Sequence, residues 1–393
     1  MQKHLLLVSF LPPMQGTGTS IILERHLLQL DRKGWKVSVV VPEHRVQSAN
    51  KLSNSWQVIP LLARRWWWPP FRPQIPGSLE MRLHLWQLEC ERVLGREKPS
   101  AILTVLWDIY PLLAMRLSKS WKVPLSVIIH DQPELWTKSE AEHRLIRQRS
   151  ATILNQAARV WPVSRELGDV YKLKETQKIS VLSPIPEENS WSFSEWKSYF
   201  KSHPVVAHAG SLHQFQLPNL QSLASALQKV NGTLLLITPG NNPVLSKLLE
   251  VYPNVKYHEP FAHNRDVIKF LSDNASCILV SYSFGVSEQP WAATSFPSKL
   301  VEFSHLGLPV LILAPSSTAI SNWAKEHQWL SYISQLNEAE FLKVLNKLTV
   351  KETWLEMAQQ TQKVALNEFN PNQIQSQFES ELALALHARY ANT

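Results

Sequence analysis

Residues 297–310 read PSKLVEFSHLGLPV, and this stretch decides how the chain is expected to fold. It contains a turn, a short helix and the start of a buried strand. Ser298 is expected to cap the helix, because its hydroxyl can accept a hydrogen bond from a backbone N–H of the first turn. Gly307 and Pro309 are expected to end the helix and to start a strand over 310–313.

Two charged side chains stand at the start of this helix. Lys299 adds a positive charge beside the unpaired N–H groups of a helix N-terminus, which attract anions. Glu302 follows three residues later, and its carboxylate can accept two hydrogen bonds from a vicinal diol such as a ribose. The pattern therefore predicts a site for a nucleotide diphosphate. The alternative is ordinary helix-start chemistry, in which these residues serve only the helix.

The full stretch resembles the donor-site signature of GT-B glycosyltransferases of the family 4 type. There a Pro-Ser-Lys-Leu-x-Glu segment, followed by an aromatic residue and then Gly-x-Pro-Val, is frequent, and residues 297–310 match it nearly position for position. The resemblance implies an α/β fold of GT-B architecture, with two Rossmann-like domains facing a central cleft. It also implies transfer of a hexose from a nucleotide diphosphate sugar to a glycan or lipid-linked acceptor, with retention and without a metal or another cofactor.

Short apolar runs alternate with helical patterns along both halves of the chain. Strands are expected over 5–10, 37–41, 100–106, 125–129 and 158–163, and again over 205–210, 233–238, 255–258 and 277–281. Helices are expected over 20–33, 79–94, 111–120 and 139–157, and again over 219–230 and 264–273. Continuous buried strands that alternate with helices predict two parallel sheets, each covered on both faces.

A polar, proline-rich stretch separates the two arrays. It runs from about Pro184 to Pro204 and contains no buried strand. We therefore expect an N-terminal acceptor-binding domain over 1–190 and a C-terminal nucleotide-sugar-binding domain over 191–375. In the GT-B fold the last helix crosses back onto the N-terminal domain, and residues 376–393 are the candidate for it.

The composition is that of a globular protein, with 44% hydrophobic residues in a chain of 393. No apolar run reaches the ~18 residues that span a bilayer. The apolar start of the chain ends at Pro12 and Pro13 without a small-residue cleavage site, which favours a first strand over a signal peptide. Cys90 and Cys277 are too few for a disulfide framework or a thiolate metal cluster, and a reducing cytosol is expected.

The positive charge is concentrated in the first half of the chain. Residues 1–190 contain 26 Lys and Arg against 17 Asp and Glu, whereas the whole chain has a net charge of +8. This asymmetry predicts a surface for an anionic partner, and peripheral attachment at the inner membrane face is one expectation. A generally basic, soluble face is the alternative. No nucleic-acid-binding module is visible, so nucleic acid is not an expected partner.

One aromatic segment stands out within this half. Residues 64–72 read RRWWWPPFR, which combines tryptophan with arginine. Indole rings and arginines suit a membrane interface, and they equally suit stacking on sugar rings. The alternative is a loop that packs on the core.

The C-terminal half departs from the family pattern at two places. The family commonly has an Arg and a Lys that hold the diphosphate after the glycine at position 210, but no Arg or Lys occurs between Gly210 and Gln228 here. Thr294 stands where many members carry the first acid of a Glu-x7-Glu pair. The residues that the resemblance assigns to donor binding are Gly210, Ser211, Gly240, Thr294, Ser298, Lys299 and Glu302.

Two segments of the N-terminal half are candidates for the acceptor side. Gly16, Thr17 and Gly18 follow the first strand, and the family's glycine loop borders the donor phosphate and the acceptor. His130 and Asp131 follow a strand, and ligands bind at the carboxyl ends of strands in open α/β sheets. The resemblance places the histidine beside the transferred sugar, whereas a structural role is the alternative. The catalytic candidates are His130, Asp131 and Lys299, and no metal ligand is assigned.

Two other functions remain open on the sequence. The first is a catalytically inactive glycosyltransferase-like protein that binds a sugar or a partner, which the two departures motivate. The second is a nucleotide-sugar epimerase of the same fold. An epimerase would need further carboxylates toward the cleft, and Asp108 and Asp131 are the candidates.

Overall fold

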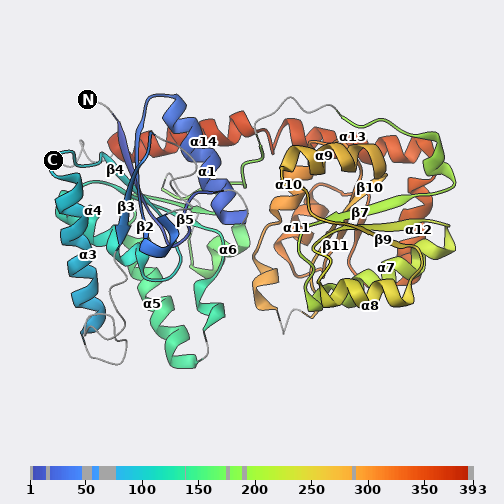
Figure 1. Ribbon diagram of the computed structural model, residues 1–393, viewed down its shortest axis with the longest axis horizontal. Coiled ribbons are helices and arrows are strands. Elements are labelled where there is room, and N and C mark those ends of the chain that lie inside the picture. Colours follow the sequence, from blue (N-terminus) through green and yellow to red (C-terminus); the bar gives the residue numbers. More distant parts are fainter. Residues whose placement is uncertain are drawn as a thin grey trace. The chain divides into compact units, whose positions relative to one another are not determined.

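A computed structural model describes residues 3–14, 18–46, 55–61, 77–137, 139–173, 178–187, 193–285 and 289–387. The chain divides into two compact units, of which the first comprises Met1–Ile185 with Asn372–Thr393 and the second Pro186–Pro371. Each unit is built on a six-stranded sheet with helices on both sides (Figure 1). The predicted α/β class with two Rossmann-like domains is confirmed.

The sheet of the first unit has the strand order of a doubly wound dinucleotide-binding fold. Its order is β3-β2-β1-β4-β5-β6, and every described pairing is parallel. The strands are β1 (His4–Val8), β2 (Lys36–Pro42), β3 (Gln57–Leu61), β4 (Ala101–Val105), β5 (Leu125–Ile129) and β6 (Arg159–Pro162). The helices are α1 (Gly18–Arg32), α3 (Ser78–Leu94), α4 (Tyr110–Trp121), α5 (Glu140–Gln156), α6 (Arg165–Val170) and α14 (Pro371–His387).

The second unit repeats this order when its strands are taken along the chain. The sheet runs β12-β11-β10-β7-β8-β9, so its two central strands are β7 and β10. The strands are β7 (Val205–Ala209), β8 (Thr233–Ile237), β9 (Val255–His258), β10 (Cys277–Ser281), β11 (Val310–Leu313) and β12 (Tyr332–Ile333). The helices are α7 (Leu217–Lys229), α8 (Pro243–Val251), α9 (Asn264–Asn274), α10 (Ser298–Ser304), α11 (Ala319–Glu326), α12 (Glu338–Leu348) and α13 (Lys351–Leu366). In such sheets ligands bind beyond the strand ends where the order reverses, which here is between β7 and β10.

The sequence pattern missed the least regular elements. The edge strand β3 contains Pro60 and is only partly buried, so it lacks the continuous apolar run that marked the central strands. Proline is tolerated there because an edge strand has N–H groups that need no partner. The pattern also missed the short strand β12 and the helices α8 and α11.

Helix α14 completes the core of the first unit. Its residues Ile374, Phe378 and Leu382 are buried in the same cluster as the strand residues of that unit. The ring of Phe378 lies 5.0 Å from the ring of Trp161 in β6. Residues that follow the second unit in sequence therefore belong, by their packing, to the first.

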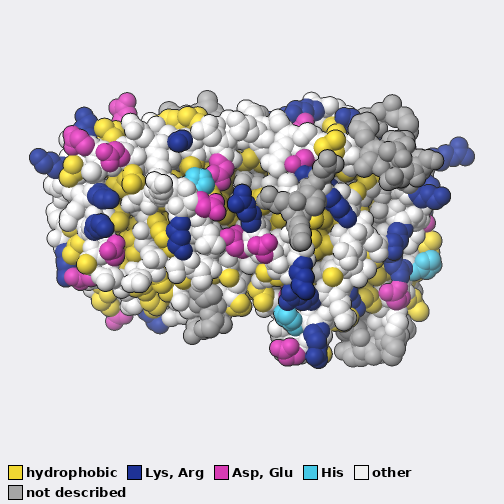
Figure 2. All heavy atoms as spheres, turned by 180° about the vertical axis from the view of Figure 1, so that it is seen from behind, with side chains coloured by type: hydrophobic (Ala, Val, Ile, Leu, Met, Phe, Trp, Pro, Cys, Tyr) yellow, Lys and Arg dark blue, Asp and Glu magenta, His cyan; other side chains and the backbone are white. Residues whose placement is uncertain are grey.

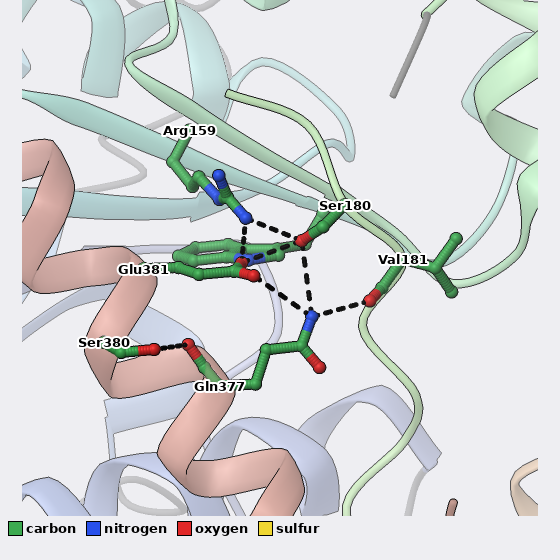
Figure 3. Close-up of polar contacts among 7 residues, drawn as sticks. Arg159, Ser180, Val181, Gln377, Ser380 and Glu381 are labelled. Atoms are coloured by element: carbon green, nitrogen blue, oxygen red, sulfur yellow. Dashed lines mark hydrogen bonds and ion pairs between the residues drawn. The ribbon is translucent and has the colours of Figure 1, made fainter. Parts of the chain in front are cut away.

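A buried polar network also attaches α14 to the edge strand β6 (Figure 3). The Glu381 carboxylate pairs with the guanidinium of Arg159, and these side chains are 15% and 5% exposed. The same carboxylate accepts hydrogen bonds from the Ser180 hydroxyl, at 2.8 Å, and from the indole N–H of Trp161. The Gln377 amide donates to the carbonyl of Val181 at 3.0 Å. Because each charge is offset by partners, the network orients α14 without leaving a buried charge uncompensated.

Two further observations bear on environment. Among the described residues, no helix is both long and apolar enough to cross a bilayer. Cys90 and Cys277 are buried and unbonded, one in each unit. Burial raises the pKa of both thiols, in the case of Cys277 to about 12, so neither thiol is a ready nucleophile.

The network predicts a large cost for removing one carboxylate. Glu381→Ala should destabilise the first unit by about 3 kcal/mol, because it deprives the buried Arg159 of its counter-charge. The loss of unfolding free energy can be measured by urea denaturation, with hydrogen exchange of the β6 amides as the local probe. Lys33→Ala is the matched control, since Lys33 pairs with Glu379 on the same helix but is 52% exposed. We expect it to cost less than about 1 kcal/mol. Equal costs for the two variants would contradict the assignment.

Candidate functional site

The start of α10 differs in one respect from its prediction. The helix begins at Ser298, and its N-cap position is Pro297, which is extended (φ −77°, ψ 110°) and offers no side-chain cap. The predicted capping role of Ser298 is therefore wrong. The physical reason is that Pro297, whose ring restricts φ, already supplies the extended residue that precedes a helix, so that the serine enters the first turn.

Lys299 lies directly over Gly210, which follows β7. A Cβ atom at position 210 would stand 2.6 Å from the Lys299 Nζ and 2.9 Å from its Cε. Gly210 also has φ +124°, a conformation that side-chain-bearing residues rarely adopt. The space beside Gly210 is therefore occupied by the end of the Lys299 side chain.

A buried histidine accompanies this lysine. His208 in β7 is 1% exposed, and its Nε2 lies 3.3 Å from Lys299 Nζ. Burial, with the Lys299 charge as a further cause, holds the pKa of His208 well below its usual range, so the ring is neutral and can accept from the ammonium. Burial also lowers the pKa of Lys299 to about 8. His208 was not predicted from the sequence, although a histidine inside the buried run Val-Val-Ala-His-Ala was a signal.

The carboxyl end of β10, the other central strand, is held by an asparagine. The side-chain amide of Asn219 in α7 donates to the Ser281 hydroxyl at 2.7 Å and to the Tyr282 carbonyl at 2.6 Å. Asn219 is 1% exposed, so these bonds are shielded from water. They fix the strand end that adjoins β7 at the reversal of strand order.

Glu302 receives a partner that the sequence did not predict. The side-chain amide of Asn264, the first residue of α9, donates to Glu302 Oε1 at 2.6 Å. The same nitrogen donates to Glu187 Oε2 at 2.8 Å. An asparagine at a helix start is usually interpreted as a cap, and Glu187 lies outside any regular element, so neither residue carried a signal in the pattern.

The remaining donor-side candidates have separate surroundings. Thr294 is 6% exposed, and its hydroxyl lies 3.4 Å from the Trp291 carbonyl. The Gly240 N–H donates to Glu259 Oε1 at 3.2 Å, and a Cβ atom there would meet this oxygen at 2.5 Å. Ser211 follows Gly210 and is exposed. Lys299 and Gly210 are thus in contact, whereas Gly240 contacts Glu259 and Tyr257.

In the first unit, His130 and Asp131 follow β5 as expected. Burial lowers the pKa of His130 to about 4, with the charge of His26 as the lesser cause, and its Nε2 is buried without a hydrogen-bond partner among the described residues. Burial raises the pKa of Asp131. Gly18 begins α1. Gly16, Thr17 and the aromatic segment 64–72 lie outside the described residues.

A second buried acid lies near these residues in sequence. Glu134 is 1% exposed and accepts a hydrogen bond at 2.7 Å from the hydroxyl of Tyr171. Glu134 was not among the residues predicted from the sequence. Within the described ranges no group of three or more His, Cys, Asp or Glu side chains is arranged to hold a metal ion.

Comparisons with known proteins give a family match for the first unit and fold matches for the whole chain. Residues 17–171 match the family model of the glycosyl transferase 4-like domain. Comparison with curated proteins gives no match. Among solved structures, the Anabaena protein HepE in complex with UDP has a TM-score of 0.67 at 13% identity, covering 97% of this chain and 100% of that one. The lipopolysaccharide outer core galactosyltransferase WaaB has a TM-score of 0.67 at 12% identity, covering 96% and 99%.

The same fold also serves another activity. A Listeria monocytogenes protein assigned as a UDP-N-acetylglucosamine 2-epimerase has a TM-score of 0.60 at 15% identity, covering 100% of this chain and 98% of that one. Identities this low establish the fold alone. The predicted resemblance to family 4 glycosyltransferases is confirmed over residues 17–171, and the chain has the GT-B fold.

The contact between Lys299 and Gly210 can be tested through stability. Gly210→Ala should cost about 1–3 kcal/mol of unfolding free energy, from backbone strain and from the collision with Lys299. Combining it with Lys299→Ala should cost less than the sum of the single variants, because the collision is removed. Denaturant unfolding of the four proteins measures the coupling. Gly34→Ala is the control, since φ is +81° there but nothing lies within 4 Å of its Cβ position. If the losses of unfolding free energy of Gly210→Ala and Lys299→Ala simply add up in the double variant, the two residues are not in contact.

Proposed function

We propose that the protein is a glycosyltransferase that moves a hexose from a nucleotide diphosphate sugar to a glycan or lipid-linked acceptor, with retention and without a metal. The family 4-like domain and the GT-B fold support the reaction class. The observation that carries the proposal is the position of Lys299, whose ammonium lies over Gly210 beyond the carboxyl end of a central strand.

In this proposal Lys299 binds and stabilises the donor diphosphate. The charge that develops on the leaving diphosphate is best stabilised by a cation that is already in place and partly shielded from water. The neutral ring of His208 orients the ammonium without adding a second charge. No Arg or Lys follows Gly210 as far as Gln228. Lys299 therefore binds the diphosphate without the Arg and Lys that commonly do so in the family.

The other residues of the second unit complete the donor site in this proposal. Glu302 accepts hydrogen bonds from the ribose hydroxyls. Gly210, whose own N–H donates to the Ile237 carbonyl at 2.9 Å, and Ser211 adjoin the diphosphate. Thr294 and Gly240 are candidates for contacts with the sugar and the nucleoside. Ser298 contributes its hydroxyl from the first turn of α10, since it does not cap the helix.

The first unit supplies the acceptor side. His130 is held neutral by burial, and a buried Nε2 without a partner among the described residues fits a hydrogen bond to a sugar hydroxyl. Asp131 is the adjacent acid, and Gly16, Thr17 and Gly18 are proposed to border the acceptor. No residue is assigned as a nucleophile, because the leaving phosphate itself can accept the proton of the acceptor hydroxyl.

An anionic surface is proposed as a further partner of the first unit. The charge excess of residues 1–190 supports it, and attachment to the inner face of a membrane would bring a lipid-linked acceptor close. Figure 2 shows Lys and Arg side chains spread over the face that it draws, interspersed with Asp and Glu. A surface of this kind favours salt-sensitive, reversible attachment over insertion.

A catalytically inactive binding protein is the second candidate. The lack of Arg and Lys between Gly210 and Gln228 favours it, because the diphosphate then has fewer cations to stabilise its charge. A panel of nucleotide sugars with product detection distinguishes the candidates. Transfer or hydrolysis of a donor supports the enzyme, conversion of the sugar to its epimer supports an epimerase, and nucleotide binding without any product supports the binding protein.

The donor site predicts a specific loss of affinity. Lys299→Ala and Glu302→Ala should each weaken UDP binding by roughly 10- to 100-fold, since each removes a charge-assisted hydrogen bond. Isothermal calorimetry with UDP, GDP and ADP measures this. Lys229→Ala is the control, because Lys229 belongs to the same unit but pairs with Glu338 at the surface, 51% exposed. Unchanged affinity in both site variants would overturn the assignment.

The lowered pKa of Lys299 predicts a pH dependence of binding. The ammonium form binds the diphosphate, so affinity should fall as pH rises through the Lys299 pKa of about 8. At one pH unit above this value, Lys299 of the unliganded protein is about 10% protonated, which corresponds to roughly a tenfold loss of UDP affinity. Lys299→Arg should remain flat between pH 7 and 9.5, because guanidinium stays charged. An unchanged slope in Lys299→Met would show that another group titrates.

A further inference from the structure

Glu302 does not stand alone in the structure. The amide nitrogen of Asn264 donates to Glu302 Oε1 at 2.6 Å and to Glu187 Oε2 at 2.8 Å. All three side chains are partly buried. One asparagine therefore links two acidic residues, and one of these is the proposed ribose ligand.

The hydrogen-bonding chemistry of the three groups determines the orientation of the Asn264 side-chain amide. A side-chain amide has two N–H donors on one nitrogen, whereas an ionised carboxylate only accepts. The Asn264 nitrogen, not its oxygen, must therefore face both acids, and each N–H has its own carboxylate. Hydrogen bonds of this charge-assisted kind are short and roughly twice as strong as neutral ones. The amide plane is thus held from two sides.

The link also reduces the repulsion between two like charges. The shared amide offers a positive N–H edge to each carboxylate and so offsets their repulsion. An ionised carboxylate offers about four lone-pair positions, so one amide N–H does not fill it.

The three residues come from separate parts of the second unit. Glu187 lies two residues after Ile185, where the first unit gives way to the second. Asn264 opens α9 after β9, and Glu302 lies in α10. The segment that enters the unit is thereby tied, through α9, to the helix that carries both Lys299 and Glu302.

We infer that Asn264 is a positioning residue of the donor site: it holds the Glu302 carboxylate in one orientation for the ribose hydroxyls, and Glu187 fixes Asn264 in turn. This inference rests on the proposed function, because it takes Glu302 as the ribose ligand. It adds two residues, neither of which touches the nucleotide, to those that determine how tightly the nucleotide is bound.

Asn264→Asp tests the inference with almost no change of shape. At pH 8 the new carboxylate cannot donate and repels both acids, so UDP affinity relative to wild type should fall roughly tenfold, the value of one hydrogen bond to a charged group. At pH 5 a carboxyl group in this acidic setting takes up a proton and donates again, so the ratio to wild type should approach one. Asn264→Leu is the matched control, which should show the loss at both pH values.

Two further measurements separate positioning from general damage. With a nucleotide that lacks one ribose hydroxyl, 2′-deoxy-UDP, the penalty of Asn264→Asp should shrink, because Glu302 then has less to bind. Glu187→Ala should weaken UDP binding about threefold in the wild-type background, as expected for a residue that acts through another, and should have no effect in Asn264→Leu. Thermal unfolding of each variant checks that it is folded.

The possible outcomes are distinct. If the wild type binds none of UDP, GDP and ADP, the proposed function and the inference both fail. If the wild type binds UDP and Glu302→Ala does not, but Asn264→Asp binds like the wild type at pH 8, the inference alone fails. Should the Asn264 variants not fold, equal UDP affinity in Glu187→Ala and wild type would likewise overturn it.

Discussion

A parallel sheet covered by helices on both faces leaves only the ends of its strands open to a ligand, and this constraint determines where chemistry can occur in both units. The central strands are buried along their whole length, as in the run of leucines in β1. Candidate functional residues therefore lie in the turns that follow the strands. Gly210 follows β7, where the order of its sheet reverses, and His130 and Asp131 follow β5. The rest of the site depends on which side chains the neighbouring helices bring to those turns.

In the second unit, helix α10 brings Lys299 to the turn after β7. Its ammonium occupies the space that a side chain at Gly210 would take, and it has a neutral histidine as its neighbour. In the proposed function, a diphosphate gains more from this one charge in a partly dehydrated position than it would in water. The proposed site relies on this single cation, since no Arg or Lys occurs between Gly210 and Gln228.

Two acids of the described residues are held by several polar partners or by a shared one. Glu381 is held by Arg159, Ser180 and Trp161, and Glu302 shares the Asn264 amide with Glu187. The first arrangement attaches α14 to the unit whose sequence lies some two hundred residues earlier. The second is the one that we propose to position a carboxylate for a ligand. In both cases the physical requirement is the same, since an uncompensated charge away from water is costly.

Three features could be predicted from the residue pattern alone: the alternation of strands and helices, the two Rossmann-like arrays, and the placement of Lys299 and Glu302 in one short helix. These features depend on periodicity and on spacing within a single element, which local sequence controls. The contacts between elements became visible only in the folded chain: Lys299 lies over Gly210, His208 accompanies it, Asn264 joins Glu302 to Glu187, and Pro297 rather than Ser298 precedes the helix. Each contact between side chains joins residues far apart in the chain, through the order of strands and the packing of helices. A pattern within one segment carries no information about which distant side chain will meet it.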